Sequence, residues 1–175
     1  MEKINFQLKL QVTFLREGRR FIAYTPALDL STSGRSFEEA KKRSTEANTI
    51  FFEEIIKNGM LEEVLSSLGW QKAEKSWQPP VVISQESETI NVAANVWLGM
   101  SHISPISWRK FEKFLLYIGC HFVREKGDHR VYLREGLKRP VVLPRDSALP
   151  IFVIRNNLRT LNIDVEEYTE ILKRI

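Results

Sequence analysis

The stretch from Gly119 to Pro144, GCHFVREKGDHRVYLREGLKRPVVLP, constrains the fold more than any other part of the chain, because three short strand-like runs alternate in it with turn-forming residues. Strands are predicted at residues 120–126, 129–134 and 139–144. Between the first two, Gly127-Asp128 favours a two-residue type II′ hairpin turn, since glycine adopts a positive φ without steric cost. Ser107 begins a predicted helix before these strands, and another helix is expected from about Leu149 to Leu161. The order helix, three strands, helix predicts a small α+β domain.

A single histidine, His129, directly follows this turn, and basic residues surround it in the sequence. An imidazole exchanges protons near neutral pH, and lysine and arginine side chains bind phosphates. The pattern therefore indicates either an RNA-binding or nuclease-like surface around His129, or a soluble hairpin with a surface histidine. The basic residues expected to bind RNA in the first case are Arg124, Lys126, Arg130, Arg134, Lys138 and Arg139.

The charge of the chain is unevenly distributed, which suggests different partners for its two halves. Residues 1–98 carry 12 Lys and Arg against 13 Asp and Glu, whereas residues 99–175 carry 14 against 9. Residues 107–145 alone hold 10 basic and 4 acidic side chains, so the positive charge is concentrated around His129. This concentration favours a polyanionic ligand there.

Composition and cysteine usage exclude several classes of protein. No stretch approaches the ~18 consecutive apolar residues of a membrane span, and the N-terminus lacks a secretion signal, so a cytoplasmic protein is expected. Cys120 is the only cysteine, which excludes an internal disulfide, and it is expected to be a packed core residue. No spacing of His, Cys or carboxylate residues suits a metal site, so neither a metal nor another cofactor is expected.

The first half of the chain predicts a hairpin followed by helices. Apolar residues alternate with mostly polar ones from Ile4 to Phe14, which is typical of a strand with one buried face. Further elements are predicted as strands at residues 20–25 and near 31–34, helices at 36–57 and 61–68, and a strand-like segment at 89–96. Ser36 and Glu39 form the capping box that begins the longer helix.

These elements divide the chain into two predicted domains. The first covers residues 1–98, a linker covers residues 99–106, and the second covers residues 107–175. Small and turn-forming residues between Gly99 and Pro105 mark the boundary.

Two segments resemble families of toxin–antitoxin systems. The stretch FIAYTPALDLSTSGRSFEEA resembles the HicB antitoxin family, with matches to its signature at Ala23, Pro26, Leu28, Gly34, Ser36, Glu38, Glu39 and Ala40. The later stretch resembles the HicA toxin family, with matches at Gly119, Val123, Arg124, Lys126, Gly127, His129 and Pro144. Asp128 stands where the HicA family has a serine.

The resemblance implies a partial RNase-H-like fold, ββ(β)α(α)β, for the first domain and a double-stranded-RNA-binding-like fold, αβββα, for the second. HicA proteins are metal-independent mRNA-cleaving toxins that use the hairpin histidine, and HicB proteins bind and silence them. The resemblance therefore implies a toxin and its antitoxin on one polypeptide, with RNA as a partner. The two domains are expected to contact each other within one chain or between the chains of a homo-oligomer. Binding to operator DNA is not implied, because the HicB-like half lacks a recognisable helix-turn-helix or ribbon-helix-helix motif.

In such a domain His129 is expected to be catalytic. It would remove the proton of a ribose 2′-hydroxyl that attacks phosphorus, or stabilise the developing charge as an imidazolium. Two other interpretations remain. One is a module that binds RNA but no longer cuts it, which Asp128 in place of the family's serine suggests. The other is an assembly protein in which both domains make only protein contacts.

Overall fold

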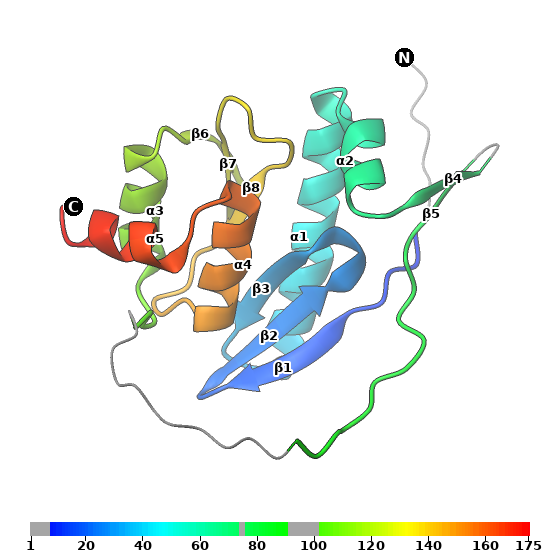
Figure 1. The fold of residues 1–175 in the computed structure, drawn as a ribbon, viewed down its shortest axis with the longest axis horizontal. Helices are drawn as coiled ribbons and strands as arrows, with labels where there is room; N and C mark the ends of the chain where they lie inside the picture. The colour runs from blue at the N-terminus through cyan, green and yellow to red at the C-terminus, as the bar shows by residue number, and fades with distance from the viewer. Residues whose placement is uncertain (1–7, 74–75, 91–101) are drawn as a thin grey trace.

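The computed structural model describes residues 8–73, 76–90 and 102–175. They form a mixed α+β structure of two units that pack against each other (Figure 1). We call residues 8–73 and 76–90 the N-terminal unit and residues 102–175 the C-terminal unit. In this described part of the chain, no helix combines the length and the apolar character needed to cross a membrane.

The N-terminal unit contains a three-stranded antiparallel sheet of order β1-β2-β3 that packs on a long helix. Its elements are β1 (Thr13–Glu17), β2 (Arg20–Thr25), the 3-10 turn η1 (Pro26–Leu28), β3 (Leu30–Gly34), α1 (Phe37–Lys57), α2 (Leu61–Ser67), β4 (Gln71–Ala73) and β5 (Ser76–Gln78). The predicted cap of α1 is confirmed, because the hydroxyl of Ser36 accepts a hydrogen bond from the amide of Glu39 at 3.2 Å. The carboxylate of Glu39 reaches back to the amide of Arg35, at 2.6 Å.

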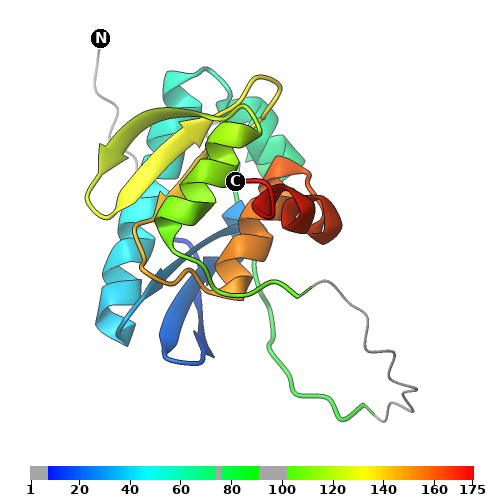
Figure 2. The same cartoon turned by 90° about the vertical axis from the view of Figure 1, so that its left-hand side faces the viewer.

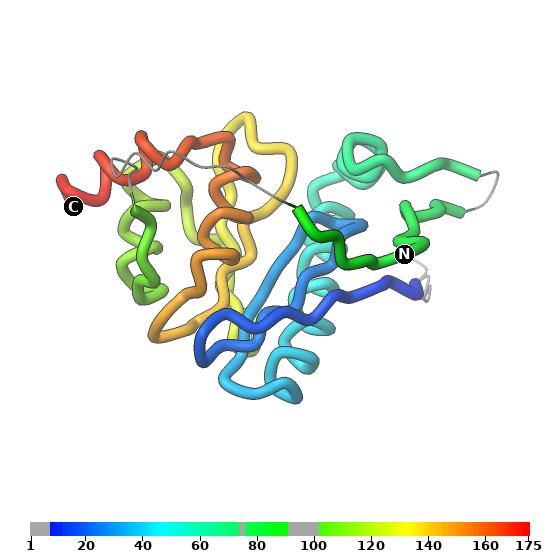
Figure 3. The backbone as a smooth tube through the Cα atoms, turned by 60° about the horizontal axis from the view of Figure 1, so that its bottom comes forward, coloured from blue at the N-terminus to red at the C-terminus, as the bar shows by residue number. Residues whose placement is uncertain are grey.

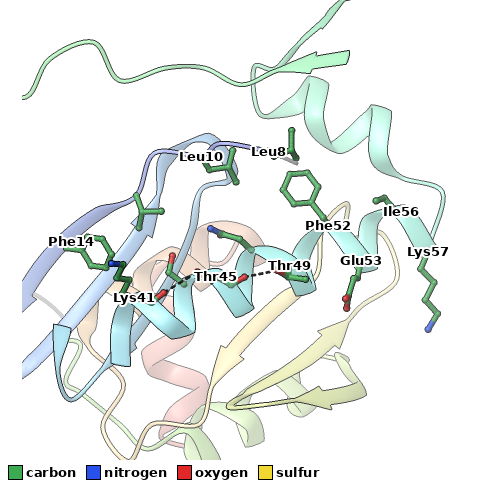
Figure 4. A pocket seen from close by; sticks show the side chains of 13 residues that line it. Leu8, Leu10, Phe14, Lys41, Thr45, Thr49, Phe52, Glu53, Ile56 and Lys57 are labelled. Atoms are coloured by element: carbon green, nitrogen blue, oxygen red, sulfur yellow. Dashed lines mark hydrogen bonds between the residues drawn. The ribbon is translucent and has the colours of Figure 1, made fainter. Parts of the chain in front are cut away.

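The first strand is shorter than the alternating sequence predicts. β1 pairs with β2 only from Thr13 onward, because β2 ends at Thr25 and Pro26 begins the 3-10 turn. The predicted strand is therefore wrong over residues 8–12, and residues 4–7 lie outside the described part of the chain. Residues 8–12 instead run along α1 on one side of an apolar groove (Figure 4).

The segment after β5 forms no strand within the residues that the structure describes. It runs beside residues 11–13, where the side-chain amide of Gln11 exchanges hydrogen bonds of 3.1 and 2.6 Å with the backbone of Val82 (Figure 3). Of the strand-like segment predicted at residues 89–96, Thr89 and Ile90 are not in a strand, and the rest lies outside the described residues.

The C-terminal unit has the predicted order of helix, three strands and helix. Its elements are α3 (Trp108–Tyr117), β6 (His121–Lys126), β7 (His129–Leu133), β8 (Val141–Pro144), α4 (Ile151–Leu161) and α5 (Val165–Leu172). The strands form an antiparallel sheet of order β6-β7-β8. Ser107 caps α3 as predicted, since its hydroxyl accepts from the amide of Lys110 at 3.3 Å.

The sheet of the C-terminal unit is covered on both faces. On one face, Tyr132 and Leu143 belong to the hydrophobic core made with α3, α4 and α5. On the other face, Val131 and Val142 join a second core, to which α1 contributes Phe51. Side chains alternate between the two faces of a strand, which explains this division. The two units therefore share a hydrophobic core through α1.

A carboxylate of the N-terminal unit caps a helix of the C-terminal unit. α4 begins after Pro150, which offers no side-chain cap. Glu17, at the end of β1, accepts hydrogen bonds from the amides of Ile151 at 2.6 Å and Phe152 at 3.0 Å. A helix leaves its first four amides without partners, and negative charge is favourable at that end. The start of α4 is therefore completed by the N-terminal unit.

We expect Glu17→Ala to lower the free energy of unfolding by about 1–2 kcal/mol, because loss of a helix cap typically costs ~0.5–2 kcal/mol. Urea unfolding followed by circular dichroism measures this loss. Glu88→Ala is the matched control, since Glu88 is exposed. Its effect should stay below about 0.5 kcal/mol. Equal stabilities of the two variants would show that α4 does not need this cap.

Candidate functional site

His129 is the first residue of β7 and directly follows the predicted turn. Gly127 has a φ of 54°, and Asp128 does not share the positive φ, as a type II′ turn requires. Lys126 and His129 are partners across the two-residue loop. The predicted hairpin is therefore confirmed.

The ring of His129 is enclosed between the two units, and the exposed fraction of the residue is 0%. Its Nε2 atom lies 2.8 Å from the hydroxyl of Thr32 in β3, and its Nδ1 atom lies 3.0 Å from a carboxylate oxygen of Glu46 in α1. Both partners belong to the N-terminal unit. The sequence predicts an accessible histidine, both for an RNA-binding surface and for a simple hairpin. This prediction is wrong for the assembled chain, because α1 and β3 cover the ring.

His129 is neutral near pH 7 in this setting. Burial has the largest influence and lowers the pKa of His129 below its ordinary value, while Glu46 offsets this effect only in part. A neutral imidazole donates through one ring nitrogen and accepts through the other. Nδ1–H therefore donates to Glu46, and Nε2 accepts from the hydroxyl of Thr32. Residues of the N-terminal unit thus fix the ring in one tautomer.

This pKa makes the stability of the chain depend on pH. Because the pKa of His129 is lowered on folding, the unfolded chain binds more protons than the folded chain just below the ordinary value of 6.5. The contribution of His129 to stability is complete above about pH 6.5 and is lost as the pH falls below it.

We expect the midpoint of thermal unfolding to fall as the pH is lowered from about 7.5 to about 5.5, and to fall less steeply in His129→Gln, which cannot take up this proton. The exposed residues His102 and His121 remain in both proteins and serve as an internal control. Parallel slopes for the two proteins would contradict the assignment of this pH dependence to His129.

Two of the predicted RNA-binding residues are paired with carboxylates of α1. The guanidinium of Arg124 lies 2.5 Å from Glu54 and 2.8 Å from Glu53, and the amine of Lys126 lies 2.5 Å from Glu53. The hydrogen bond from Lys126 lowers the pKa of Glu53 below its usual range, and Arg124 acts in the same direction. Glu54 is only 1% exposed, so Arg124 is paired with a buried side chain of α1.

Two more of the predicted residues lie in the loop before β8 and also contact the N-terminal unit. Lys138 forms an ion pair of 3.1 Å with Glu63 of α2. Arg139 forms an ion pair of 2.8 Å with Asp29 and donates a hydrogen bond to the carbonyl of Leu28 at 2.9 Å. The N-terminal unit therefore covers this end of the predicted patch as well.

The last two predicted residues contact only the C-terminal unit among the described residues. Arg130 lies on the opposite face of β7 from His129, since neighbouring side chains alternate, and it pairs with Glu112 of α3 at 2.8 Å. Arg134 donates to the carbonyl of Leu161 at the end of α4, at 2.9 Å. The six basic residues predicted to bind RNA therefore do not share one face, because Arg124 and Lys126 lie against α1 whereas Arg130 lies against α3.

A second buried polar cluster, which the sequence analysis missed, lies beside this turn. Asp146 is 3% exposed and accepts from Arg20 at 2.7 Å, from Arg43 at 3.1 Å and from the hydroxyl of Ser33 at 2.5 Å. Arg43 also pairs with Asp128 at 3.1 Å. No local signal marks these pairs, because 126, 103 and 113 positions separate Asp146 from its three partners.

Cys120 and the acidic residues do not form a metal centre in the described part of the chain. No group there of three or more His, Cys, Asp or Glu residues could hold a metal ion. Cys120 is 4% exposed and belongs to the core of the C-terminal unit, which confirms its prediction as a packed residue. Burial raises the pKa of its thiol and keeps it protonated.

Comparison with known proteins identifies one part of the chain. Residues 108–163 match the family model described as "HicA toxin of bacterial toxin-antitoxin". The match runs from the start of α3 past the end of α4, and it confirms the predicted HicA domain, including the hairpin of His129. It does not include the N-terminal unit. Searches of curated proteins and of solved structures found no match.

Proposed function

We propose that this chain is a self-inhibited toxin of a toxin–antitoxin system, in which the C-terminal unit binds and cleaves RNA and the N-terminal unit holds it inactive. The enclosure of His129 by Thr32 and Glu46 carries the proposal, because the side chain expected to react is the one that the N-terminal unit covers. The match to the HicA toxin family supports the toxin half.

Carboxylates of α1 occupy positions that RNA phosphates would take. These carboxylates are Glu46, Glu53 and Glu54, and their partners in the C-terminal unit are His129, Arg124 and Lys126. Charge-assisted hydrogen bonds to carboxylates and to phosphates use the same donors. RNA therefore has to displace α1 before it reaches the reactive face, so inhibition is both steric and electrostatic.

In this proposal the N-terminal unit is an antitoxin of the HicB type with a partial RNase-H-like fold. The residues that resemble HicB extend from β2 through β3 into the start of α1, in the order that this resemblance implies. The unit acts on the C-terminal unit of the same chain. Its carboxylate Asp29 is held by Arg139 and Arg159 at 2.8 and 2.9 Å, so we assign it a binding role and no RNase H chemistry.

Cleavage would begin when α1 moves away. The pKa of His129 then returns towards its ordinary value, about 6.5, which suits a general base near neutral pH. His129 removes the proton of a ribose 2′-hydroxyl while that oxygen attacks the adjacent phosphorus. The bond to the 5′-oxygen of the next nucleotide breaks, and this oxygen takes a proton from the imidazolium or from water. The products are a 2′,3′-cyclic phosphate and a 5′-hydroxyl end, and Arg124 and Lys126 hold the phosphate.

A chain that binds RNA without cutting it is the second candidate, and Asp128 favours it. A carboxylate beside the imidazole repels an approaching phosphate. In the assembled chain Arg43 pairs with Asp128 at 3.1 Å, but Arg43 belongs to α1 and leaves with it. Salt-sensitive binding of RNA by the opened chain without product would identify this function.

The test compares RNA cleavage by the wild-type chain and by the full-length variant Glu46→Arg with Glu54→Arg, which opens α1. Cleavage that disappears when His129→Ala is added supports the first function. Binding that is stronger than that of the wild-type chain, without cleavage, supports the second. A folded, opened chain that neither cleaves RNA nor binds it more strongly than the wild-type chain overturns both.

A further inference from the structure

A second cationic surface lies on the face of the C-terminal unit that α1 does not cover. Its exposed members are Arg109 of α3, Phe122 of β6 and Arg145 after β8. They adjoin the partly buried Arg130 of β7 and the indole of Trp108 of α3, which is only 9% exposed, and we call this set of residues the Trp108 surface. α3 covers the sheet face opposite α1, and Figure 2 shows α3 in the foreground. Within the described residues, the ion pairs and ring contacts of these five residues all lie in the C-terminal unit.

Arginine side chains surround the indole of Trp108. The guanidinium carbons of Arg109, Arg130 and Arg145 lie 4.8, 5.2 and 5.6 Å from the centre of the Trp108 ring system. A guanidinium that stacks on an aromatic face keeps its N–H groups directed outward in the plane of the group, where they can bind phosphate oxygens. The indole thus holds three cationic groups in place before any ligand arrives.

The charge of this surface is only partly neutralised. Glu112 pairs with Arg130 at 2.8 Å, and Glu125 pairs with Arg145 at 2.6 Å. Arg109 forms no ion pair with any residue that the structure describes, and the same holds for the exposed lysines Lys110 and Lys113 of α3. The helix and the adjacent strands therefore present a net positive charge to solvent.

Exposed apolar side chains adjoin these cations. Phe122 is 43% exposed although Arg130 lies only 4.2 Å from the centre of its ring, and Leu116 and Tyr117 at the end of α3 are 50% and 53% exposed. Aromatic rings interleaved with arginines are typical of surfaces that bind single-stranded nucleic acid, because bases stack on the rings while the cations hold the backbone. An acidic peptide would use the cations but would leave Phe122 without a partner.

We propose that the Trp108 surface binds single-stranded RNA, and that it does so while His129 is still covered. This inference goes beyond the proposed function and does not depend on cleavage, since the side chains of Phe122 and Arg130 lie on the sheet face opposite the enclosed ring of His129. Its consequence is that the inhibited chain is already bound to RNA. Opening of α1 would then expose the reactive face next to a strand that is held nearby.

The experiment uses the full-length wild-type chain, in which α1 covers His129, and a fluorescent single-stranded RNA of about 20 nucleotides. Fluorescence anisotropy should report binding that weakens steeply between about 50 and 200 mM salt. Phe122→Ala should weaken binding about tenfold, because it removes a stacking platform. Arg109→Ala should weaken binding about threefold to tenfold and reduce its salt dependence, because it removes one phosphate contact.

Arg19→Ala is the matched control, because it removes an exposed arginine of the β1–β2 turn in the N-terminal unit. It should leave the affinity unchanged. Circular dichroism and thermal unfolding establish that each variant is folded. The proposal is overturned if the folded wild-type chain does not bind RNA at low salt, or if Arg19→Ala and Arg109→Ala weaken binding equally. Equal binding of poly-glutamate at the same charge concentration would also overturn it, in favour of an acidic protein partner.

Discussion

Charge reversal at two carboxylates of α1, Glu46→Arg together with Glu54→Arg, is expected to turn an inactive chain into one that cleaves RNA. The new arginines would face His129 and Arg124, which Glu46 and Glu54 now hold at 3.0 and 2.5 Å. Glu54→Arg places two like charges together at Arg124, and Glu46→Arg places a charge without a partner beside the buried, neutral ring of His129. Both changes are costly in a buried interface, so α1 has to leave the sheet. The ring of His129 then becomes accessible and can accept a proton.

The cleavage rate of the opened chain should exceed that of the wild-type chain at least about 100-fold, because general acid–base catalysis typically contributes ~10²–10⁴ in rate. Adding His129→Ala to the opened chain should remove this gain. The measurement is the appearance of 5′-hydroxyl ends from a labelled RNA. Growth arrest on expression of the opened chain, but not of the opened chain with His129→Ala, provides an independent readout.

The control for this variant reverses two exposed carboxylates that do not touch the sheet face of His129. Glu38→Arg with Glu135→Arg changes the net charge by the same amount at exposed positions, and this chain should stay inactive. As a second measurement, residues 102–175 alone should cleave RNA, and residues 1–98 added to them should suppress cleavage. Folded, opened chains and folded fragments that leave RNA intact would contradict an enzymatic C-terminal unit.

Local signals in the sequence were sufficient to predict the C-terminal unit. The turn at Gly127-Asp128 and the cap at Ser107 depend on residues no more than a few positions apart, and both are confirmed. The strand predicted from the alternating residues before Phe14 is wrong over residues 8–12, because a strand also needs a partner strand and β2 ends at Thr25. Periodicity indicates which residues are apolar on one side, but it does not indicate whether a sheet or a helix lies against them.

The candidate site was predictable in its chemistry but not in its environment. The sequence places a histidine among basic residues, and the charge difference between the halves suggests that an acidic first half could cover it. The burial of His129 follows from contacts with Thr32 and Glu46, which lie 97 and 83 positions away. No local pattern in a single sequence indicates contacts between residues so far apart. The same reason hides Arg43, whose partners Asp128 and Asp146 belong to the other unit.

Loss of the carboxylate of Asp146 should lower stability more than any other single substitution among the residues that join the two units. Asp146 is the acceptor for Arg20, Arg43 and Ser33, and Asp146→Ala would leave the buried guanidinium of Arg43 without its buried carboxylate partner. Removal of one member of a buried ion pair typically costs about 3–5 kcal/mol, and we expect a loss of that size in the free energy of unfolding. Urea denaturation followed by tryptophan fluorescence measures it.

Asp146→Asn separates charge from shape at the same position, because the amide keeps one acceptor oxygen and nearly the same volume. It should lose less stability than Asp146→Ala but more than Glu135→Ala, an exposed position at which the change should stay below about 0.5 kcal/mol. Since Arg20 and Arg43 both come from the N-terminal unit, the two Asp146 variants should also make His129 more accessible. Their rates of RNA cleavage should therefore rise in the same order as their losses of stability. A destabilised Asp146→Ala chain that remains as inactive as wild type would show that this cluster stabilises the fold without contributing to inhibition.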